Sequence, residues 1–280
     1  WKTPYVIHLG GNPWADMAGG QLRPAKILLE RAACVVCNSD FLYHEVKAHL
    51  PKAEVLKGGL WGLGHTIVGP QPSRFKPKTR HDVRKVLRVV FSMALYSGNG
   101  GWCNKQKWSG LPRFMEQIEP VIEKLRNDGI EPEFTCYGKG EDDFPHLQEW
   151  EERWGLRFVM QHHLIDKEDH WPEALRKAHV FVHPSLYDCW PRVVAEAMMT
   201  GVPTLVYDTV GNVHVGDSVL RADPENDQQV CDAFEALATN EGLRRTLGGE
   251  MIVEAATKHE KHRGDYAEIL TRCLERARRK

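Results

Sequence analysis

Two acidic residues, Asp188 and Glu196, lie eight positions apart around the start of a segment with a helical pattern. Pro191 between them suits a first helical turn, where its missing N–H is not needed. The amides and the dipole at a helix start attract anions, so a phosphate could bind beside Asp188. Because Pro191 donates no amide, the donors would come from Arg192, Val193 or a side chain. Glu196, about two turns into the helix, could accept hydrogen bonds from ribose or sugar hydroxyls.

The same two carboxylates also allow a purely structural interpretation. Asp188 could merely cap the helix, as acidic residues at this position often do. Glu196 could lie on a solvated helix face, where a carboxylate needs no partner. The two interpretations differ in where the surrounding elements place these side chains.

From residue 86 onward, short β-branched runs alternate with longer amphipathic ones. An apolar stripe from Leu111 to Leu125 predicts a helix capped near Ser109 and kinked at Pro120. Strands are expected at 86–95, 134–138, 156–161, 179–185 and 203–208, and further helices near 146–153, 171–178, 191–200, 225–238 and 241–258. This alternation predicts a mostly parallel, doubly wound sheet.

Residues 1–80 show a smaller version of the same pattern. Strands are expected at 5–10 and 34–39, helices near 22–32 and 40–50, and a further strand-like run follows them. The Pro-rich stretch 69–82 then reads as a linker between two domains.

Polar residues follow most of the predicted strands, at the edge of the sheet where open α/β folds bind ligands. These clusters are 8–12, which begins with His8, then 97–101, 138–141, which begins with Gly138, 184–188 and 209–212. A binding site is therefore expected beyond the carboxyl ends of the strands.

The segment HPSLYDCWPRVVAEAMMTGVPTLVYDTVGN, residues 183–212, resembles the retaining glycosyltransferases of family 4. The likeness rests on an acidic residue, Asp188, then seven residues, Glu196, Ala197-Met198 and a Gly-x-Pro at 201–203. The family usually has Glu at the first of these positions and often Gly where Pro191 stands. IVGPQPSRFKP and YGKGED occur in the family's order and spacing too, so the resemblance covers nearly the whole chain.

The resemblance implies a GT-B fold, an α/β fold of two Rossmann-like doubly wound parallel-sheet domains. Residues 1–80 would be a partial, acceptor-side N-terminal domain, and residues 81–262 the C-terminal domain that binds the nucleotide-sugar donor. Residues 263–280 would form a C-terminal helix packing back on the first domain. The family's first domain ordinarily has several βα units before its His-bearing strand, so the first domain is expected to be incomplete.

The resemblance also implies roles for individual residues. Asp188 would lie near the donor sugar and Glu196 would bind the ribose, with Gly138 in the family's glycine turn of the nucleotide site. Lys107, with Lys105 as a substitute, would stabilise the charge of the departing diphosphate. The alternative for Lys107 is a solvated loop lysine.

Two further positions carry the family comparison. Near the end of the strand before Lys107, the family has an arginine where this chain has Met93. This departure removes one positive charge from the phosphate-binding site. His8 matches a family histidine that faces the donor sugar and the acceptor, although a histidine at a strand end can also be structural.

Composition limits the partners and the compartment. The 280 residues carry a net charge of -1, so nucleic acid is not an expected partner, and no run approaches a membrane-spanning length. The basic tail 272–280 leaves peripheral membrane contact open. The 7 cysteines are scattered, which favours a reducing, cytoplasmic setting. Cys34 and Cys37 point to opposite faces of a strand, and no metal site is expected.

The sequence thus predicts a metal-independent retaining glycosyltransferase without a cofactor. Its donor would be a nucleotide sugar, UDP- or GDP-linked, and its acceptor a hydroxyl of an unknown sugar, lipid or protein. The alternatives are a nucleotide-sugar-binding module without turnover and a GT-B epimerase.

Overall fold

A computed structural model describes residues 6–9, 19–37, 40–57, 75–95, 101–140, 145–160, 170–188, 191–209 and 216–279. The chain divides into two compact units, one made of Trp1–Gly69 with Ala256–Lys280 and the other of Pro70–Ala255. The domain limits after residues 80 and 262, and the acceptor-side and donor-side roles given to the domains, stay predictions.

The first unit contains a small parallel sheet with strand order β1-β2-β3. Along the chain it runs β1 (Val6–Leu9), α2 (Gly19–Arg31), β2 (Cys34–Cys37), α3 (Asp40–His49) and β3 (Val55–Lys57). All four residues of the central strand β2 are buried, as expected for a parallel strand covered on both faces. Cys34 and Cys37 are free, and burial raises the pKa of the Cys37 thiol to about 12.

The second unit is built on a six-stranded parallel sheet with the order β6-β5-β4-β7-β8-β9. The strands are β4 (Val86–Leu95), β5 (Glu131–Gly140), β6 (Arg157–Met160), β7 (Val180–His183), β8 (Thr204–Tyr207) and β9 (Leu220–Ala222). The chain first winds outward from β4 to β6 and then returns to add β7 beside β4. This change of direction opens a crevice beyond the carboxyl ends of β4 and β7.

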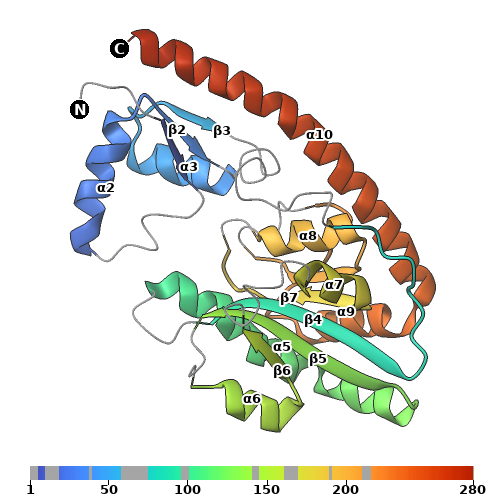
Figure 1. Cartoon of the computed structure of the whole chain (residues 1–280). Helices are drawn as coiled ribbons and strands as arrows, with labels where there is room; N and C mark the ends of the chain where they lie inside the picture. The colour runs from blue at the N-terminus through green and yellow to red at the C-terminus, as the bar shows by residue number, and fades with distance from the viewer. Residues whose placement is uncertain are drawn as a thin grey trace. The chain divides into compact units, whose positions relative to one another are not determined.

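Helices cover both faces of this sheet (Figure 1). They are α5 (Gly101–Asn127), α6 (Leu147–Trp154), α7 (His170–Lys177), α8 (Arg192–Thr200) and α9 (Asp227–Thr239), followed by α10 (Glu241–Arg279). Val180 and Val182 of β7 join the core cluster beneath α5, α6 and α9. Phe181 and His183 point to the opposite face, where Phe181 contacts Trp171 of α7.

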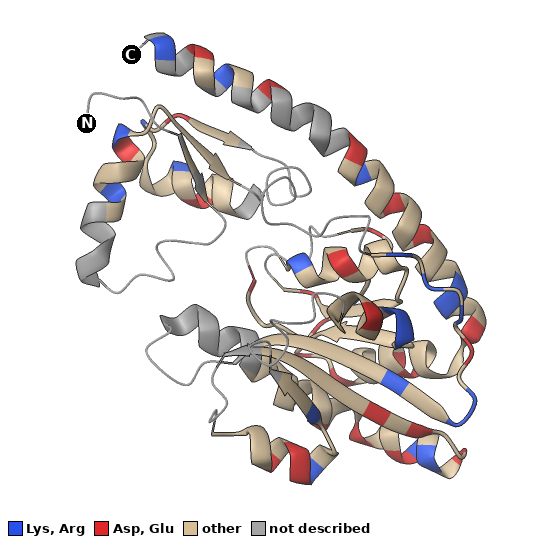
Figure 2. Ribbon diagram, in the orientation of Figure 1, with Lys and Arg blue, Asp and Glu red and all other residues tan. Residues whose placement is uncertain are grey.

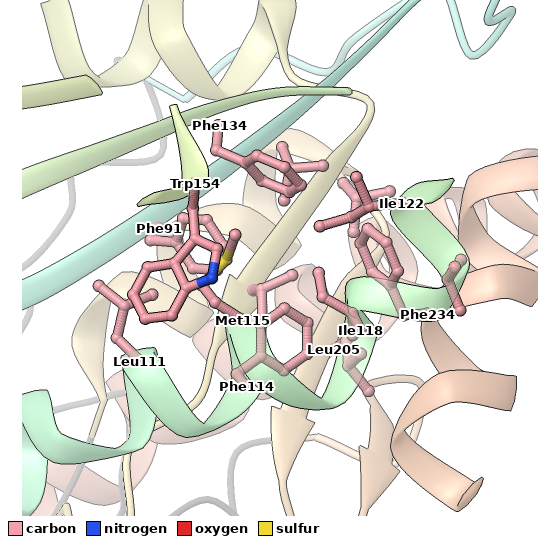
Figure 3. Close-up of a cluster of buried hydrophobic side chains, with 14 of the residues drawn as sticks. Phe91, Leu111, Phe114, Met115, Ile118, Ile122, Phe134, Trp154, Leu205 and Phe234 are labelled. Atoms are coloured by element: carbon pink, nitrogen blue, oxygen red, sulfur yellow. The ribbon is translucent and has the colours of Figure 1, made fainter. Parts of the chain in front are cut away.

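The core of the second unit centres on Phe114 of α5 (Figure 3). Its ring makes edge contacts with Phe91 at 5.9 Å, Phe234 at 5.7 Å and Tyr207 at 6.2 Å between centroids. Such aromatic pairs contribute about 0.5–1.5 kcal/mol each beyond the area they bury. The predicted apolar stripe of this helix is confirmed, because its members, Leu111 to Leu125, are buried.

The start predicted for this helix is wrong. Ser109 was expected to cap it, whereas α5 begins at Gly101 and continues through Pro120 to Asn127. The Lys and Gln residues of 101–108 are good helix formers, so the helix propagates in front of the apolar stripe. Lys105 and Lys107 therefore lie on a helix rather than in a loop.

The second part of the predicted linker, residues 75–82, is anchored in the second unit. The Lys78 backbone N–H donates to the Thr200 carbonyl at 2.9 Å, and its Nζ donates to the Ala178 carbonyl at 2.5 Å. Arg244, only 1 % exposed, donates from Nε to the His81 carbonyl at 2.9 Å. Burial, together with the nearby Arg244 charge, lowers the pKa of Lys78 to about 8. Residues 75–82 are thus packed chain and not a free tether.

The C-terminal helix also differs from expectation. Separate helices were predicted at 241–258 and 263–280, but α10 runs unbroken from Glu241 to Arg279. Gly264 costs the helix only about 1 kcal/mol, which the helix formers around it can offset. Acidic and basic residues are interspersed along α10 (Figure 2). Within the described ranges, no helix is both long enough and apolar enough to span a bilayer.

Candidate functional site

The turn after β7 lies at the crevice between β4 and β7. It is held by two side-chain hydrogen bonds: Ser185 Oγ donates to the Tyr187 carbonyl at 2.9 Å, and Thr209 Oγ1 donates to the Ser185 carbonyl at 2.9 Å. Because Ser185 is fully buried and Thr209 follows β8, the turn is tied to the neighbouring strand end. Asp188 comes at the end of this fixed turn.

His183, the last residue of β7, faces Asp188. Its Nε2 lies 3.5 Å from Asp188 Oδ2, and the side chains are 5 % and 14 % exposed respectively. The contact is too long or too poorly aligned to be a hydrogen bond, and among the described residues neither ring nitrogen has a hydrogen-bond partner. Sequence reasoning missed His183, although a histidine that ends a buried strand before a polar turn is a signal for it.

The helix after the turn begins one residue later than predicted. Pro191 is the N-cap residue of α8 and its side chain makes no capping hydrogen bond. Arg192, exposed, and Val193, half-buried, form the first turn with their backbone amides at the helix start. The dipole at this end favours an anion.

Glu196 is not a freely solvated carboxylate. Its Oε2 accepts a hydrogen bond of 2.6 Å from Trp171 Nε1, and the side chain is half-buried. One turn further along α8, Thr200 Oγ1 donates to the Glu196 carbonyl at 2.7 Å. Of the two interpretations offered by the sequence, the solvated face is therefore wrong for Glu196. The sequence carries no pattern that would have linked Trp171 to it.

Helix α5 approaches the turn after β7 at Gly110. A Cβ at this position would lie 1.7 Å from the Pro184 carbonyl oxygen. Lys107 precedes Gly110 by about one helical turn and Lys105 by somewhat more, so both begin close to the turn. Their side chains lie outside the described residues.

Gly138 and Met93 occupy neighbouring strands near their carboxyl ends. Gly138 on β5 pairs with Met93 on β4 and with Met160 on β6, and it is buried. Met93 is 4 % exposed and packs in the core cluster, so no cation comes from the strand position at which the sequence comparison expects an arginine. His8 lies on β1 opposite Val36, and its side chain is outside the described residues.

The residues that the structure describes contain no group of three side chains able to hold a metal ion. The described site consists of the carboxylates of Asp188 and Glu196, the Trp171 N–H and the amides at the start of α8.

The strand order of the second unit defines a doubly wound α/β unit, and similar solved structures show that the fold is of the GT-B type. HepE from Anabaena, solved with UDP and glucose, matches with a TM-score of 0.70 and 16% identity, over 96% of this chain and 71% of that one. Sucrose-phosphate synthase from Thermosynechococcus elongatus matches with a TM-score of 0.69 and 14% identity, over 96% of this chain and 68% of that one.

A third similar structure is that of TarM, with a TM-score of 0.67 and 15% identity. The match covers 97% of this chain and 49% of TarM, so the chain spans about half the length of that protein. A comparison with curated protein sequences finds no match.

The family follows from the sequence of the second unit. The model of the family Glycosyl transferases group 1 matches residues 97–240, half of the chain, including Lys107, Asp188 and Glu196. The chain belongs to this family.

Proposed function

We propose that the chain is a retaining glycosyltransferase that takes its sugar from a UDP- or GDP-sugar and needs no metal ion or cofactor. The observation that carries the proposal is the fixed carboxylate of Glu196 on α8, the helix that follows β7. Its Oε2 accepts a hydrogen bond of 2.6 Å from Trp171 Nε1. A carboxylate oriented in this way is suited to accept hydrogen bonds from the ribose diol of a nucleotide.

The phosphates would bind between the start of α8 and the start of α5. Arg192 and Val193 supply amides at a helix N-terminus, and Lys107, with Lys105 beside it, supplies positive charge. Gly138, which has no side chain, would let the nucleotide approach the carboxyl end of β5. These groups would stabilise the negative charge that develops as the diphosphate leaves.

Asp188 would lie next to the donor sugar. The buried ring of His183 at 3.5 Å limits the positions that its carboxylate can take. The acceptor hydroxyl would then attack from the face that the diphosphate leaves, which retains the configuration of the sugar. The acceptor-side roles of His8 and of residues 1–80 remain part of this proposal.

Structural relatives support the choice of donor. HepE has been solved with UDP, with UDP and glucose, and with UDP-glucose. A trehalose-6-phosphate protein from E. coli, with a TM-score of 0.64, has been solved with UDP-2-fluoro glucose. A uridine nucleotide is therefore the first donor to test.

A second candidate, a nucleotide-sugar-binding module without turnover, is favoured by one observation. Met93 is buried among apolar side chains at the strand position at which the sequence comparison expects an arginine. A site that lacks this charge would stabilise the leaving diphosphate less.

The test combines binding and turnover. The purified chain is screened by thermal shift against UDP-, GDP- and ADP-sugars, and the stabilising donor is then assayed for hydrolysis and for transfer to sugar, lipid and protein acceptors. We expect one nucleotide class to stabilise the chain and its donor to be consumed. Binding without consumption would favour the module, and no stabilisation by any donor would contradict both candidates.

Asp188→Asn tests the site within the same assay. It removes the charge beside the donor sugar, and donor consumption should fall at least about tenfold. Asp232→Asn is the matched control, because Asp232 accepts a hydrogen bond from Gln228 on the exposed face of α9. Equal activities of the two variants would contradict the role of Asp188.

A further inference from the structure

We infer that Trp171 is a positioning residue for nucleotide binding, acting through Glu196. The inference rests on the proposed function, because it takes Glu196 as the residue that binds the ribose. It adds a residue on another helix, 25 positions away in sequence, to the donor site.

The contact is a hydrogen bond from the Trp171 indole to a carboxylate. Trp171 Nε1 donates to Glu196 Oε2 at 2.6 Å. An indole has a single donor and no acceptor, so this bond uses the whole hydrogen-bonding capacity of the ring. Hydrogen bonds to an ionised acceptor are also about twice as strong as neutral ones.

The indole itself is held by aromatic contacts from two strands. Its ring centroid lies 5.3 Å from that of Tyr137 on β5 and 5.9 Å from that of Phe181 on β7. The Phe181 contact is edge-to-face, with an interplanar angle of 72°. The direction of the indole N–H is therefore fixed by the sheet, and the carboxylate that accepts it is fixed in turn.

Fixing Glu196 before the nucleotide arrives reduces the cost of binding. A glutamate on a helix surface has several rotamers, and ordering such a side chain on association lowers affinity by about two- to tenfold. Trp171 removes part of this cost in the free protein. Its loss should therefore weaken nucleoside and nucleoside diphosphate equally, since both carry the ribose.

The chain offers a matched control in a second tryptophan and glutamate pair. Trp154 Nε1 on α6 donates to Glu119 Oε1 on α5 at 3.1 Å. Trp154 is also packed in the core, at 7 % exposure, and its ring contacts that of Trp150. It reproduces the chemistry of the Trp171 contact without a place in the donor site.

The inference is tested by calorimetry with UDP. If the wild-type chain binds GDP or ADP instead, that diphosphate replaces UDP. Trp171→Phe should weaken the binding of the diphosphate and of its nucleoside by about three- to tenfold. Trp154→Phe should leave both affinities unchanged within about twofold, as expected for a site it does not touch. An unchanged affinity in Trp171→Phe would overturn the inference while leaving the proposed function intact.

A double-mutant cycle separates positioning from packing. In a Glu196→Ala background, Trp171→Phe should cause less than about a twofold further loss, because the group it positions is gone. Full additivity of the two losses would show that Trp171 acts by packing alone and would overturn the inference. If the wild-type chain binds no diphosphate, the proposed function fails and this inference fails with it.

A second variant covers the case in which Trp171→Phe does not fold. Benzothienylalanine at position 171 keeps the bicyclic ring and its contacts with Tyr137 and Phe181 but replaces the N–H by sulfur. It should show the same loss as Trp171→Phe, because both variants leave Glu196 to be ordered on binding. Wild-type affinity in this variant would overturn the inference.

Discussion

Gly110 leaves no space for a side chain above the Pro184 carbonyl: a Cβ there would lie 1.7 Å from the carbonyl oxygen and 2.9 Å from the carbonyl carbon. Real Cβ atoms do not approach so closely, so Gly110→Ala must push α5 and the turn that carries Asp188 apart. We expect a lower thermal unfolding temperature and an affinity for the nucleoside diphosphate reduced by about tenfold or more.

Gly249→Ala is the control for this substitution. Gly249 lies in α10 with no atom within 4 Å of an added Cβ, so alanine there should be neutral or stabilising by up to about 1 kcal/mol. If Gly110→Ala binds the diphosphate as tightly as Gly249→Ala does, the close approach has no importance for the site.

Lys107→Ala should discriminate between phosphate and nucleoside. Because only the diphosphate carries the charge that Lys107 would meet, its affinity should fall by about tenfold while that of the nucleoside stays unchanged. The comparison is made by calorimetry, with Lys85→Ala at the amino end of β4 as the control. Equal losses for the two ligands would assign Lys107 a structural role.

Diphosphate binding should not depend on a divalent cation. In the proposed site the positive charge comes from Lys107 and from the amides of Arg192 and Val193, and these are unaffected by a chelator. The affinity measured in EDTA should therefore equal that measured with magnesium or manganese. A loss in EDTA that manganese restores would contradict metal-independent binding.

Stability should fall on acidification between pH 6.5 and 4 because of His179. Burial, together with the charges of Lys78, Arg244 and Arg88 and against a smaller opposing effect of Asp82, lowers its pKa to about 4. Its Nδ1 accepts the Arg88 N–H at 2.9 Å, which requires the neutral ring. In this range the unfolded chain takes up a proton that the folded chain excludes. The contribution of His179 to the free energy of unfolding is therefore complete above pH 6.5 and is lost as the pH falls towards 4.

The measurement is urea unfolding as a function of pH. His179→Gln should reduce the slope of the unfolding free energy across this range, leaving the part that comes from His81, whose pKa burial and nearby positive charges also lower to about 4. His44→Gln, on the exposed side of α3, controls for the substitution itself. A slope in His179→Gln equal to that of the wild type would contradict this account of acid sensitivity.

The regular parts of the second unit were predictable from periodicity. The strand predicted at 86–95 is β4, and the helix predicted at 191–200 is α8, which begins one residue later. A short β-branched run between turn residues favours a buried strand of a parallel sheet, and the turn residues mark its ends. The strand order and the parallel pairing of all six strands confirm the doubly wound sheet.

The sequence predicted which carboxylates belong to the site, but not which side chains contact them. Asp188 and Glu196 were found because their spacing repeats a family pattern. Trp171 and His183 were missed because the tertiary structure sets their partners. The packing of α7 on α8 brings Trp171 to Glu196, and the turn after β7 brings Asp188 to His183. The start of α5 was misplaced for the opposite reason, since local helix propensity extended it beyond the buried stripe.

The affinity of Glu196→Ala for the nucleoside diphosphate tests the central claim most directly. Glu119→Ala is the matched control, because Glu119 accepts from Trp154 as Glu196 does from Trp171. Loss of a charged hydrogen-bond acceptor of the ribose should weaken binding by on the order of 1–3 kcal/mol, while Glu119→Ala binds like the wild type. An affinity of Glu196→Ala equal to that of the wild type would contradict a nucleotide site at the carboxyl ends of β4 and β7.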